Sequence, residues 1–296
     1  MSATSEKIRR DYTEIEKKRD QGLRMPADVL RYDNIPFGRS KRWNVLDVLR
    51  PFEDKGSRPV IIYVHGGEWV YADKLSYQYF CISLAQRGFI VVDFNIHLCP
   101  EKKYPEQLVD VNLAVKWTLK NGDIYGMDLD NIFMMGDSSG AQLCAQYVEM
   151  CTNPDFAAKF DIALPEGFVP KAVALNCGIF APFGQIPLFG AEADKELMAD
   201  ILPGNDYAAE TALFNAVTPV TAAFPPTFVL SCHGDPWKAF SEEFVQKLSQ
   251  EQVPHEYKIY GSEVSPLYHN FQLDIRNTAA IVSSDDECAF FRKFVK

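Results

Sequence analysis

The sequence predicts an α/β protein in which a doubly wound, mostly parallel sheet carries helices on both faces and a small helical cap. Short apolar runs alternate with longer segments of helical pattern, which is typical of βαβ units. The apolar runs are nearly continuous, as at residues 60–64, and such strands are usually covered on both faces. The 296 residues, 47% hydrophobic and 24% charged, suffice for one large domain. We therefore expect residues 1–296 to form a single domain.

Seven apolar runs have the length of strands, and most are followed by a segment whose apolar residues recur at helical spacing. The expected strands are residues 43–49, 60–64, 90–94, 132–135, 172–175, 227–231 and 256–260. The expected helices are residues 76–87, 105–121, 139–151, 239–251 and 285–294. Ligands of such sheets bind at the carboxyl ends of the strands, so we expect the functional residues in the loops that follow them.

Two segments interrupt this alternation and predict cap elements, at about residues 1–40 and 180–222. The first places Ile8, Tyr12 and Ile15 at helical spacing among charged residues. The second is a connection of a length that is usually functional. We interpret both as parts of a lid over the carboxyl ends of the strands. The alternative is that the N-terminal helix only decorates the surface and the long connection only packs against the domain.

Composition and charge narrow the class of partner. The formal charge of −10 argues against nucleic acid or an anionic membrane as the main partner. No apolar run approaches the roughly 20 residues of a membrane span, and the charged N-terminal stretch does not read as a secretory signal. Seven cysteines without a C-x-x-C pattern predict a reducing, cytoplasmic location. We expect a small-molecule partner, no metal and no cofactor, and leave the oligomeric state open.

The most informative motif is Gly136-Asp137-Ser138-Ser139-Gly140, which lies between an apolar run and a helical segment. A G-x-S-x-G turn between strand and helix is the pattern of a nucleophile elbow. The glycines allow the backbone to turn sharply where a Cβ atom would clash. The spacing makes Ser138, rather than Ser139, the predicted nucleophile.

A serine nucleophile needs a base, and the base needs a third group that holds it in one tautomer. After an elbow of this kind the acid and then the histidine follow the serine along the chain. His269 lies in the loop after the last expected strand, so we predict it as the base. Asp235 follows the preceding strand and is the predicted acid. The alternative for Asp235 is a cap on the next helix.

Acyl transfer also needs donors for the developing oxyanion. His65-Gly66-Gly67 follows the strand at residues 60–64, and consecutive glycines leave backbone N–H groups able to face a substrate. We predict the oxyanion hole at the N–H groups of Gly66, Gly67 and Ser139. His65 is expected to orient this loop.

Five motifs of the chain, in this order, resemble those of the hormone-sensitive-lipase-like branch of the α/β-hydrolase superfamily. The matching segments are His65-Gly66-Gly67, Leu98-Cys99-Pro100-Glu101, Gly136-Asp137-Ser138-Ser139-Gly140, Gly234-Asp235-Pro236 and His269-Asn270-Phe271. The resemblance implies a carboxylesterase with an α/β-hydrolase fold, an N-terminal cap element and a second cap insertion. The chain departs from the family pattern where Glu68 and Asn270 replace glycines and where His97 replaces an arginine.

Together these observations predict a serine carboxylesterase for small, soluble short-chain acyl esters, with acetylated sugars or aryl esters as candidates. The expected pocket walls include Trp69, Tyr71, Phe180, Phe183 and Phe189. Two alternatives remain open. The same catalytic groups could cleave an amide, as in an arylformamidase or a peptidase-like enzyme, or the scaffold could be a non-catalytic small-molecule-binding protein.

The acidic side chains Glu68 and Asp73 are expected to bind hydroxyl groups on the alcohol side of the substrate. For Glu68 the alternative is a side chain that faces the lid.

Overall fold

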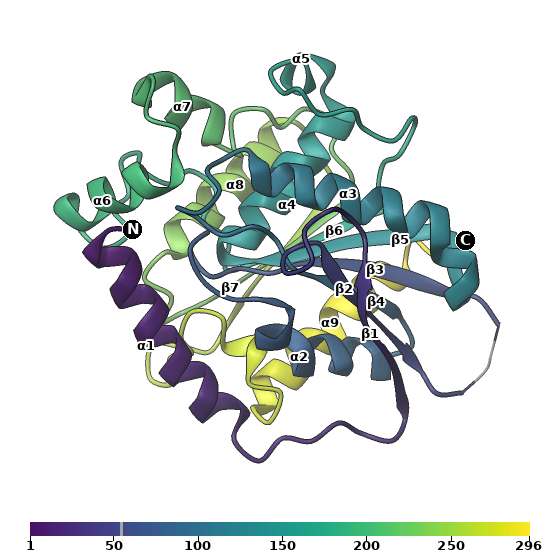
Figure 1. The fold of residues 1–296 in the computed structure, drawn as a ribbon. Helices are drawn as coiled ribbons and strands as arrows, with labels where there is room; N and C mark the ends of the chain where they lie inside the picture. Colours follow the sequence, from purple (N-terminus) through teal and green to yellow (C-terminus); the bar gives the residue numbers. More distant parts are fainter. Residues whose placement is uncertain (54–55) are drawn as a thin grey trace.

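The computed structural model describes residues 1–53 and 56–296. Within these ranges the strands form one sheet in the order β1-β2-β4-β3-β5-β6-β7-β8 (Figure 1). The strands are β1 (Val29–Pro36), β2 (Val45–Pro51), β3 (Arg58–Val64), β4 (Ile90–Phe94), β5 (Met127–Asp137), β6 (Val173–Asn176), β7 (Thr227–Cys232) and β8 (His255–Tyr260). β1 and β2 pair in antiparallel fashion, and the six strands from β4 to β8 in the sheet order are parallel. The predicted mostly parallel sheet is confirmed.

Helices cover both faces of this sheet (Figure 1). One face carries α3 (Glu106–Asn121), α4 (Ser138–Thr152) and α8 (Lys238–Gln250), and the other carries α2 (Lys74–Gln86) and α9 (Thr278–Arg292). Successive side chains of a strand point to opposite faces. In β3, for example, Ile62 belongs to the core under α3 and α4, whereas Ile61 belongs to the core under α2 and α9. This alternation of two cores is why the strands are apolar at nearly every position.

The predicted strands all occur, but the segment predicted as an N-terminal cap, residues 1–40, includes a strand of the sheet. β1 pairs with β2 and lies at the edge of the sheet, so the cap prediction is wrong for Val29–Pro36. An edge strand with one exposed face carries charged residues such as Asp33, which hid it from a search for apolar runs. The sequence also did not reveal α5 (Pro154–Ala157) or α7 (Tyr207–Phe214).

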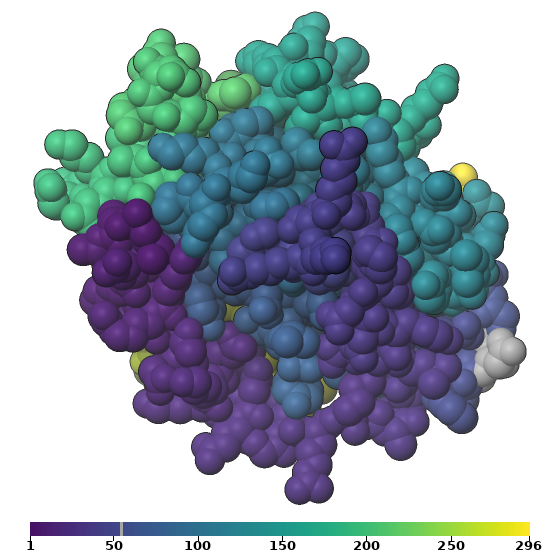
Figure 2. All heavy atoms as spheres, viewed as in Figure 1, coloured from purple at the N-terminus to yellow at the C-terminus, as the bar shows by residue number. Residues whose placement is uncertain are grey.

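The remaining N-terminal helix, α1 (Ala3–Asp20), lies beside α6 (Ala191–Ile201) of the long connection (Figure 1). The backbone N–H of Ser2 donates to Asp200, and Thr4 donates to Glu196. In the space-filling view the purple surface of α1 meets the green surface of α6 (Figure 2). The two segments predicted as cap elements are therefore in direct contact.

Further along α1, Arg9 donates to the backbone carbonyl groups of Val70 and Cys99 and pairs with Glu101. Polar contacts thus hold α1 over the loop that follows β3. This is the loop that carries the predicted oxyanion donors.

Two general findings bear on the predicted environment of the chain. No helix in the described part of the chain combines the length and apolar character needed to cross a membrane. The seven cysteines all lie in the described ranges and are unpaired; six are buried and Cys151 is half-buried.

Candidate active site

The predicted nucleophile elbow is present at the junction of β5 and α4. Ser138 has a φ of +51°, a left-handed conformation that a residue with a side chain rarely adopts. A Cβ atom on Gly140 would lie 2.2 Å from the carbonyl oxygen of Val64, and one on Gly136 would lie 2.6 Å from that of Gly140. Gly140 therefore allows the elbow to approach β3, Gly136 allows the turn itself to close, and the serine adopts the strained turn conformation.

The predicted acid and base are in contact. His269 lies in the loop after β8, and its Nδ1 atom is 3.1 Å from Oδ1 of Asp235, which lies in the loop after β7. Burial acts to raise the pKa of Asp235, but the hydrogen bond and charge of His269 outweigh it, so this pKa is lowered. Asp235 also accepts a hydrogen bond from the backbone of Trp237. The carboxylate of Asp235 therefore orients the imidazole of His269 and also stabilises the turn between Asp235 and Trp237.

Ser138 and His269 keep their reactive atoms available. In the described part of the chain, neither Oγ of Ser138 nor Nε2 of His269 has a hydrogen-bond partner, and both atoms are buried. The side chain of Asn270 donates to Asp137 over 2.7 Å, which ties the residue after His269 to the residue before Ser138. This link holds the histidine loop against the elbow, as proton transfer between serine and imidazole requires.

Asp137 is the centre of a network that the sequence did not reveal. Its carboxylate accepts hydrogen bonds from the hydroxyls of Tyr63 and Tyr77, from the backbone N–H of Gly66 and from Asn270. Burial raises the pKa of Asp137 to about 6, against the effect of these donors. The only sequence signal was its place inside the G-x-S-x-G motif. The network joins β3, α2, the elbow and the histidine loop.

The oxyanion donors are shifted by one residue from the prediction. Gly66 donates its N–H to Asp137 over 3.0 Å, so the structure does not leave it for a substrate. In the described ranges, the N–H groups of Gly67, Glu68 and Ser139 have no acceptor. Ser139 lies in the first turn of α4, where N–H groups lack intrahelical partners. The donors that the geometry offers are therefore those of Gly67, Glu68 and Ser139.

His65 orients this loop, as expected. It is buried, its ring stacks on Tyr77, and its Nδ1 atom is 2.9 Å from the carbonyl oxygen of Gly66. Burial lowers the pKa of His65, which favours the neutral ring.

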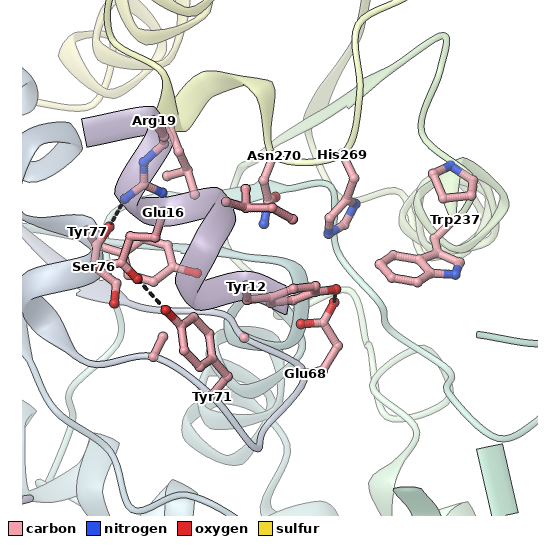
Figure 3. A pocket seen from close by; sticks show the side chains of 15 residues that line it. Tyr12, Glu16, Arg19, Glu68, Tyr71, Ser76, Tyr77, Trp237, His269 and Asn270 are labelled. Atoms are coloured by element: carbon pink, nitrogen blue, oxygen red, sulfur yellow. Dashed lines mark hydrogen bonds between the residues drawn. The ribbon is translucent and has the colours of Figure 1, made fainter. Parts of the chain in front are cut away.

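A cavity of about 270 Å³ opens beside His269, under α1 (Figure 3). Its wall includes four side chains of α1 and several aromatic rings from the loops below. The lining residues are Tyr12, Ile15, Glu16, Arg19, Gly67, Glu68, Tyr71, Ala72, Ser76, Tyr77, Pro236, Trp237, His269, Asn270 and Leu273. The indole of Trp237 packs edge-to-face on His269, with ring centroids 4.7 Å apart. Tyr71, an expected wall residue, lines this cavity.

Three predicted substrate-binding aromatics do not line this cavity. Phe180 is fully buried and stacks on Phe244 of α8 with centroids 4.1 Å apart. Trp69 packs against Phe214 and donates its indole N–H to Gln142, and Phe183 stacks on Phe214. Phe180 and Phe183 of the long connection, and Trp69 of the loop after β3, thus pack in or against the core rather than around this cavity. Phe189, the remaining expected wall, is exposed and packs edge-to-face on Trp237 without lining the cavity.

The predicted binding residue Glu68 does line the cavity. Its side chain is buried, and Oε1 accepts a hydrogen bond of 2.8 Å from the hydroxyl of Tyr12 on α1. Burial raises the pKa of Glu68 to about 7, although the proximity of His269 and the Tyr12 hydrogen bond act to lower it. Its backbone φ is +48°, and Asn270, the other residue that replaces a family glycine, has a φ of +58°. Asp73, in contrast, caps α2.

One group of potential metal ligands overlaps the site. Ligand atoms of Cys177, Asp235 and His269 lie within 4.8 Å of one another. Burial raises the pKa of the Cys177 thiol well above its usual value, and a protonated thiol is a poor metal ligand. Because Asp235 and His269 are already hydrogen-bonded to each other, their geometry fits acid–base work better than metal binding.

The fold and the elbow define the class of protein, an α/β-hydrolase. The chain belongs to the BD-FAE family, whose model matches residues 46–248. Esterase LipQ of Mycobacterium tuberculosis is 33% identical over 227 residues, which cover 72% of this chain and 52% of LipQ. The chain therefore spans about half the length of that relative.

Two further comparisons bear on the predicted resemblance. Hormone-sensitive lipase of Mus musculus is 28% identical over 121 residues, which cover 40% of this chain and 15% of the lipase. The crystal structure of Esterase B from Lactobacillus Rhamnosis superimposes with a TM-score of 0.89 and 22% identity, covering 99% of this chain and 95% of that one. The predicted α/β-hydrolase fold and the resemblance to the hormone-sensitive-lipase-like branch are confirmed.

Proposed function

We propose that this protein is a serine carboxylesterase that hydrolyses small esters with short acyl chains. The observation that carries the proposal is the placement of His269, which is held by Asp235 and tied through Asn270 to the elbow that presents Ser138. The esterase and lipase names of its relatives support the same chemistry.

In the proposed mechanism, Oγ of Ser138 attacks the ester carbonyl carbon while Nε2 of His269 takes the hydroxyl proton. The carbonyl oxygen becomes an oxyanion that accepts hydrogen bonds from the N–H groups of Gly67, Glu68 and Ser139. His269 then gives its proton to the departing alcohol oxygen, which leaves an acyl-serine. A water molecule repeats the sequence, releasing the carboxylic acid and restoring Ser138.

The dimensions of the site support a small substrate. The cavity of about 270 Å³ is below the roughly 300–1,000 Å³ typical of pockets for drug-sized ligands. Next to Glu68 in the oxyanion loop, Trp69 packs against Phe183 and Phe214, which also stack on each other. A long acyl chain would have to displace these rings.

The test is the variant Ser138→Ala with p-nitrophenyl acetate as substrate. We expect kcat to fall by about 10⁴-fold or more, because the variant has no nucleophile. Circular dichroism should be unchanged, and a fluorophosphonate probe should label the parent protein at Ser138 but not the variant. Substantial turnover by a folded Ser138→Ala variant would refute the proposal.

The same acyl-transfer groups can cleave activated amides, so the substrate panel should include formylkynurenine and aminoacyl-anilides beside nitrophenyl esters. A preference for the amides would replace the esterase assignment by an amidase one. Failure of the probe to label Ser138 would favour a binding protein. The cytoplasmic location drawn from the cysteines stays a prediction.

A further inference from the structure

We infer that the cavity under α1 receives the alcohol part of the ester, and that Glu68 selects alcohols with a hydroxyl group that donates a hydrogen bond to it. This inference rests on the proposed esterase function and specifies its substrate class as esters of polyhydroxy alcohols such as glycerol or a sugar.

The position of His269 assigns the cavity to the alcohol. His269 must return its proton to the departing oxygen, so that oxygen has to lie within hydrogen-bond reach of Nε2. The cavity opens at His269, between Trp237 and the loop that carries Glu68 (Figure 3). An alcohol that leaves from His269 therefore extends into this cavity.

Glu68 brings an unused acceptor into the cavity. Its Oε1 atom accepts one hydrogen bond, from Tyr12, whereas Oε2 has no partner in the described part of the chain and is not sealed off from the cavity. A carboxylate can accept about four hydrogen bonds, so most of the capacity of Glu68 is unfilled. A hydroxyl of a bound alcohol would supply the missing donor.

The backbone at Glu68 gives an independent reason to expect a role for the side chain. A glycine would adopt the φ of +48° without strain and would supply the same N–H to the oxyanion. Glu68 combines a strained conformation with the burial of a carboxylate beside an oxyanion site. Both costs would disappear with glycine, so a compensating contact with substrate is the simplest physical account.

The rest of the wall offers surface for the carbon skeleton of a polyol. Tyr71, Tyr77 and Trp237 offer aromatic surface on which the C–H face of a polyol can lie. Arg19 lines the same cavity, paired with Asp20 and bonded to the carbonyl of Ser76. These contacts already engage the guanidinium group of Arg19, so it leaves Glu68 available to a ligand.

The experiment compares esters that share one acyl group and differ in the alcohol. One pair is glyceryl 1-acetate with n-propyl acetate, and a second pair is acetylcholine with the neutral 3,3-dimethylbutyl acetate. For the parent enzyme we expect kcat/KM to be about tenfold higher for glyceryl acetate than for propyl acetate, because the latter leaves the buried acceptor unpaired. The ammonium group should bring no such advantage.

Variants assign the preference to one carboxylate. Glu68→Gly should bring the glyceryl-to-propyl ratio close to one, because it removes the acceptor and keeps the backbone N–H. Glu68→Gln keeps an amide oxygen that can accept, so it should lower the ratio by less. Glu16→Gln is the matched control. Glu16 lines the same cavity and also accepts from a tyrosine, Tyr71, but it is half-buried, so water can satisfy its second oxygen and the ratio should persist.

The proposal is wrong if the parent shows no preference for the hydroxylated ester or if the preference survives in both Glu68 variants. A preference for acetylcholine over its neutral analogue would overturn the choice of a hydroxyl. Hydrolysis of p-nitrophenyl acetate distinguishes failure of the proposed esterase function from failure of this inference. If the parent protein does not hydrolyse it, the esterase function is refuted. If it does but shows no alcohol selectivity, only the inference about Glu68 is refuted.

Discussion

Two buried carboxylates lie beside the catalytic groups, and they are held in different ways. Asp137 accepts four hydrogen bonds, from β3, α2, the oxyanion loop and the histidine loop. Glu68 accepts one, from Tyr12 on α1. Burial raises the pKa of both, to about 6 for Asp137 and about 7 for Glu68.

This difference in hydrogen bonding distinguishes the network around Asp137 from the part of the site around Glu68. The Asp137 network uses the carboxylate fully, so it can position the surrounding loops but has little left for a ligand. The one hydrogen bond to Glu68 comes from Tyr12 on α1, and Glu68 lines the cavity. We therefore expect the Asp137 network to position the loops and propose that Glu68 takes part in recognition.

The variant with the largest expected effect on kcat/KM, Asp235→Asn, tests which carboxylate orients His269. Asp235→Asn should lower kcat/KM by about 10³–10⁴-fold, because the amide cannot hold the same tautomer of the imidazole. Steady-state kinetics with p-nitrophenyl acetate measures this loss. A small effect would mean that Asp137 or Glu68, which also lie near His269, supplies the orientation instead.

The next effect concerns stability. Asp137→Ala leaves three buried donors and the half-buried Asn270 without their acceptor and should lower the free energy of unfolding by about 3 kcal/mol or more. Urea denaturation followed by tryptophan fluorescence measures this change. Asp137→Asn, which keeps the shape and part of the acceptor capacity, should cost less. Equal, small losses in both variants would show that the network does not position the site.

Tyr12→Phe should have a much smaller effect than loss of the Asp137 network. It removes a single hydrogen bond, worth about 1 kcal/mol, between α1 and Glu68. Urea denaturation under the same conditions gives the direct comparison. A loss as large as that of Asp137→Ala would mean that Tyr12 and Glu68 contribute to stability as the network around Asp137 does.

The smallest effect is a shift in pH dependence. Burial acts to lower the pKa of His269, but the hydrogen bond with Asp235 and the charges of Asp235, Glu68 and Asp137 outweigh it, so this pKa is raised. The neutral imidazole is the base, so kcat/KM should fall as the pH drops through this pKa. Glu68→Gln removes one negative charge, which lowers the pKa of His269.

The acidic limb of the profile should therefore move to lower pH in Glu68→Gln. Profiles of kcat/KM for the parent and the variant, measured at constant ionic strength, provide the comparison. An unmoved limb, or one moved to higher pH, would contradict the electrostatic coupling between Glu68 and His269.

Much of the site could be predicted because its signals are local. Ser138 follows from a five-residue motif between a strand and a helix, and Asp235 and His269 follow from loops after apolar strands. The apolar runs predicted the inner parallel strands β3 to β7 because both faces of those strands are buried, whereas β8 at the sheet edge is only half-buried. β1 escaped this search because an edge strand is apolar on one side only.

The identity of the free backbone donors and of the cavity wall depended on contacts between residues far apart in the chain. The predicted donor Gly66 is engaged by Asp137, and Glu68, two positions further along the loop, takes its place. The predicted wall residue Phe180 turns into the core, while Tyr12 reaches the cavity from the other end of the chain. No pattern of neighbouring residues specifies these contacts.

By itself the sequence determined the class of fold, the elbow serine and its two partners, because turn chemistry and apolar periodicity act over a few consecutive residues. Only the tertiary structure decided which backbone N–H groups remain without an acceptor, which aromatic rings form the wall, and that a carboxylate from the oxyanion loop meets a tyrosine from α1. Those outcomes depend on competition between segments far apart in the chain for the same hydrogen bonds and the same space.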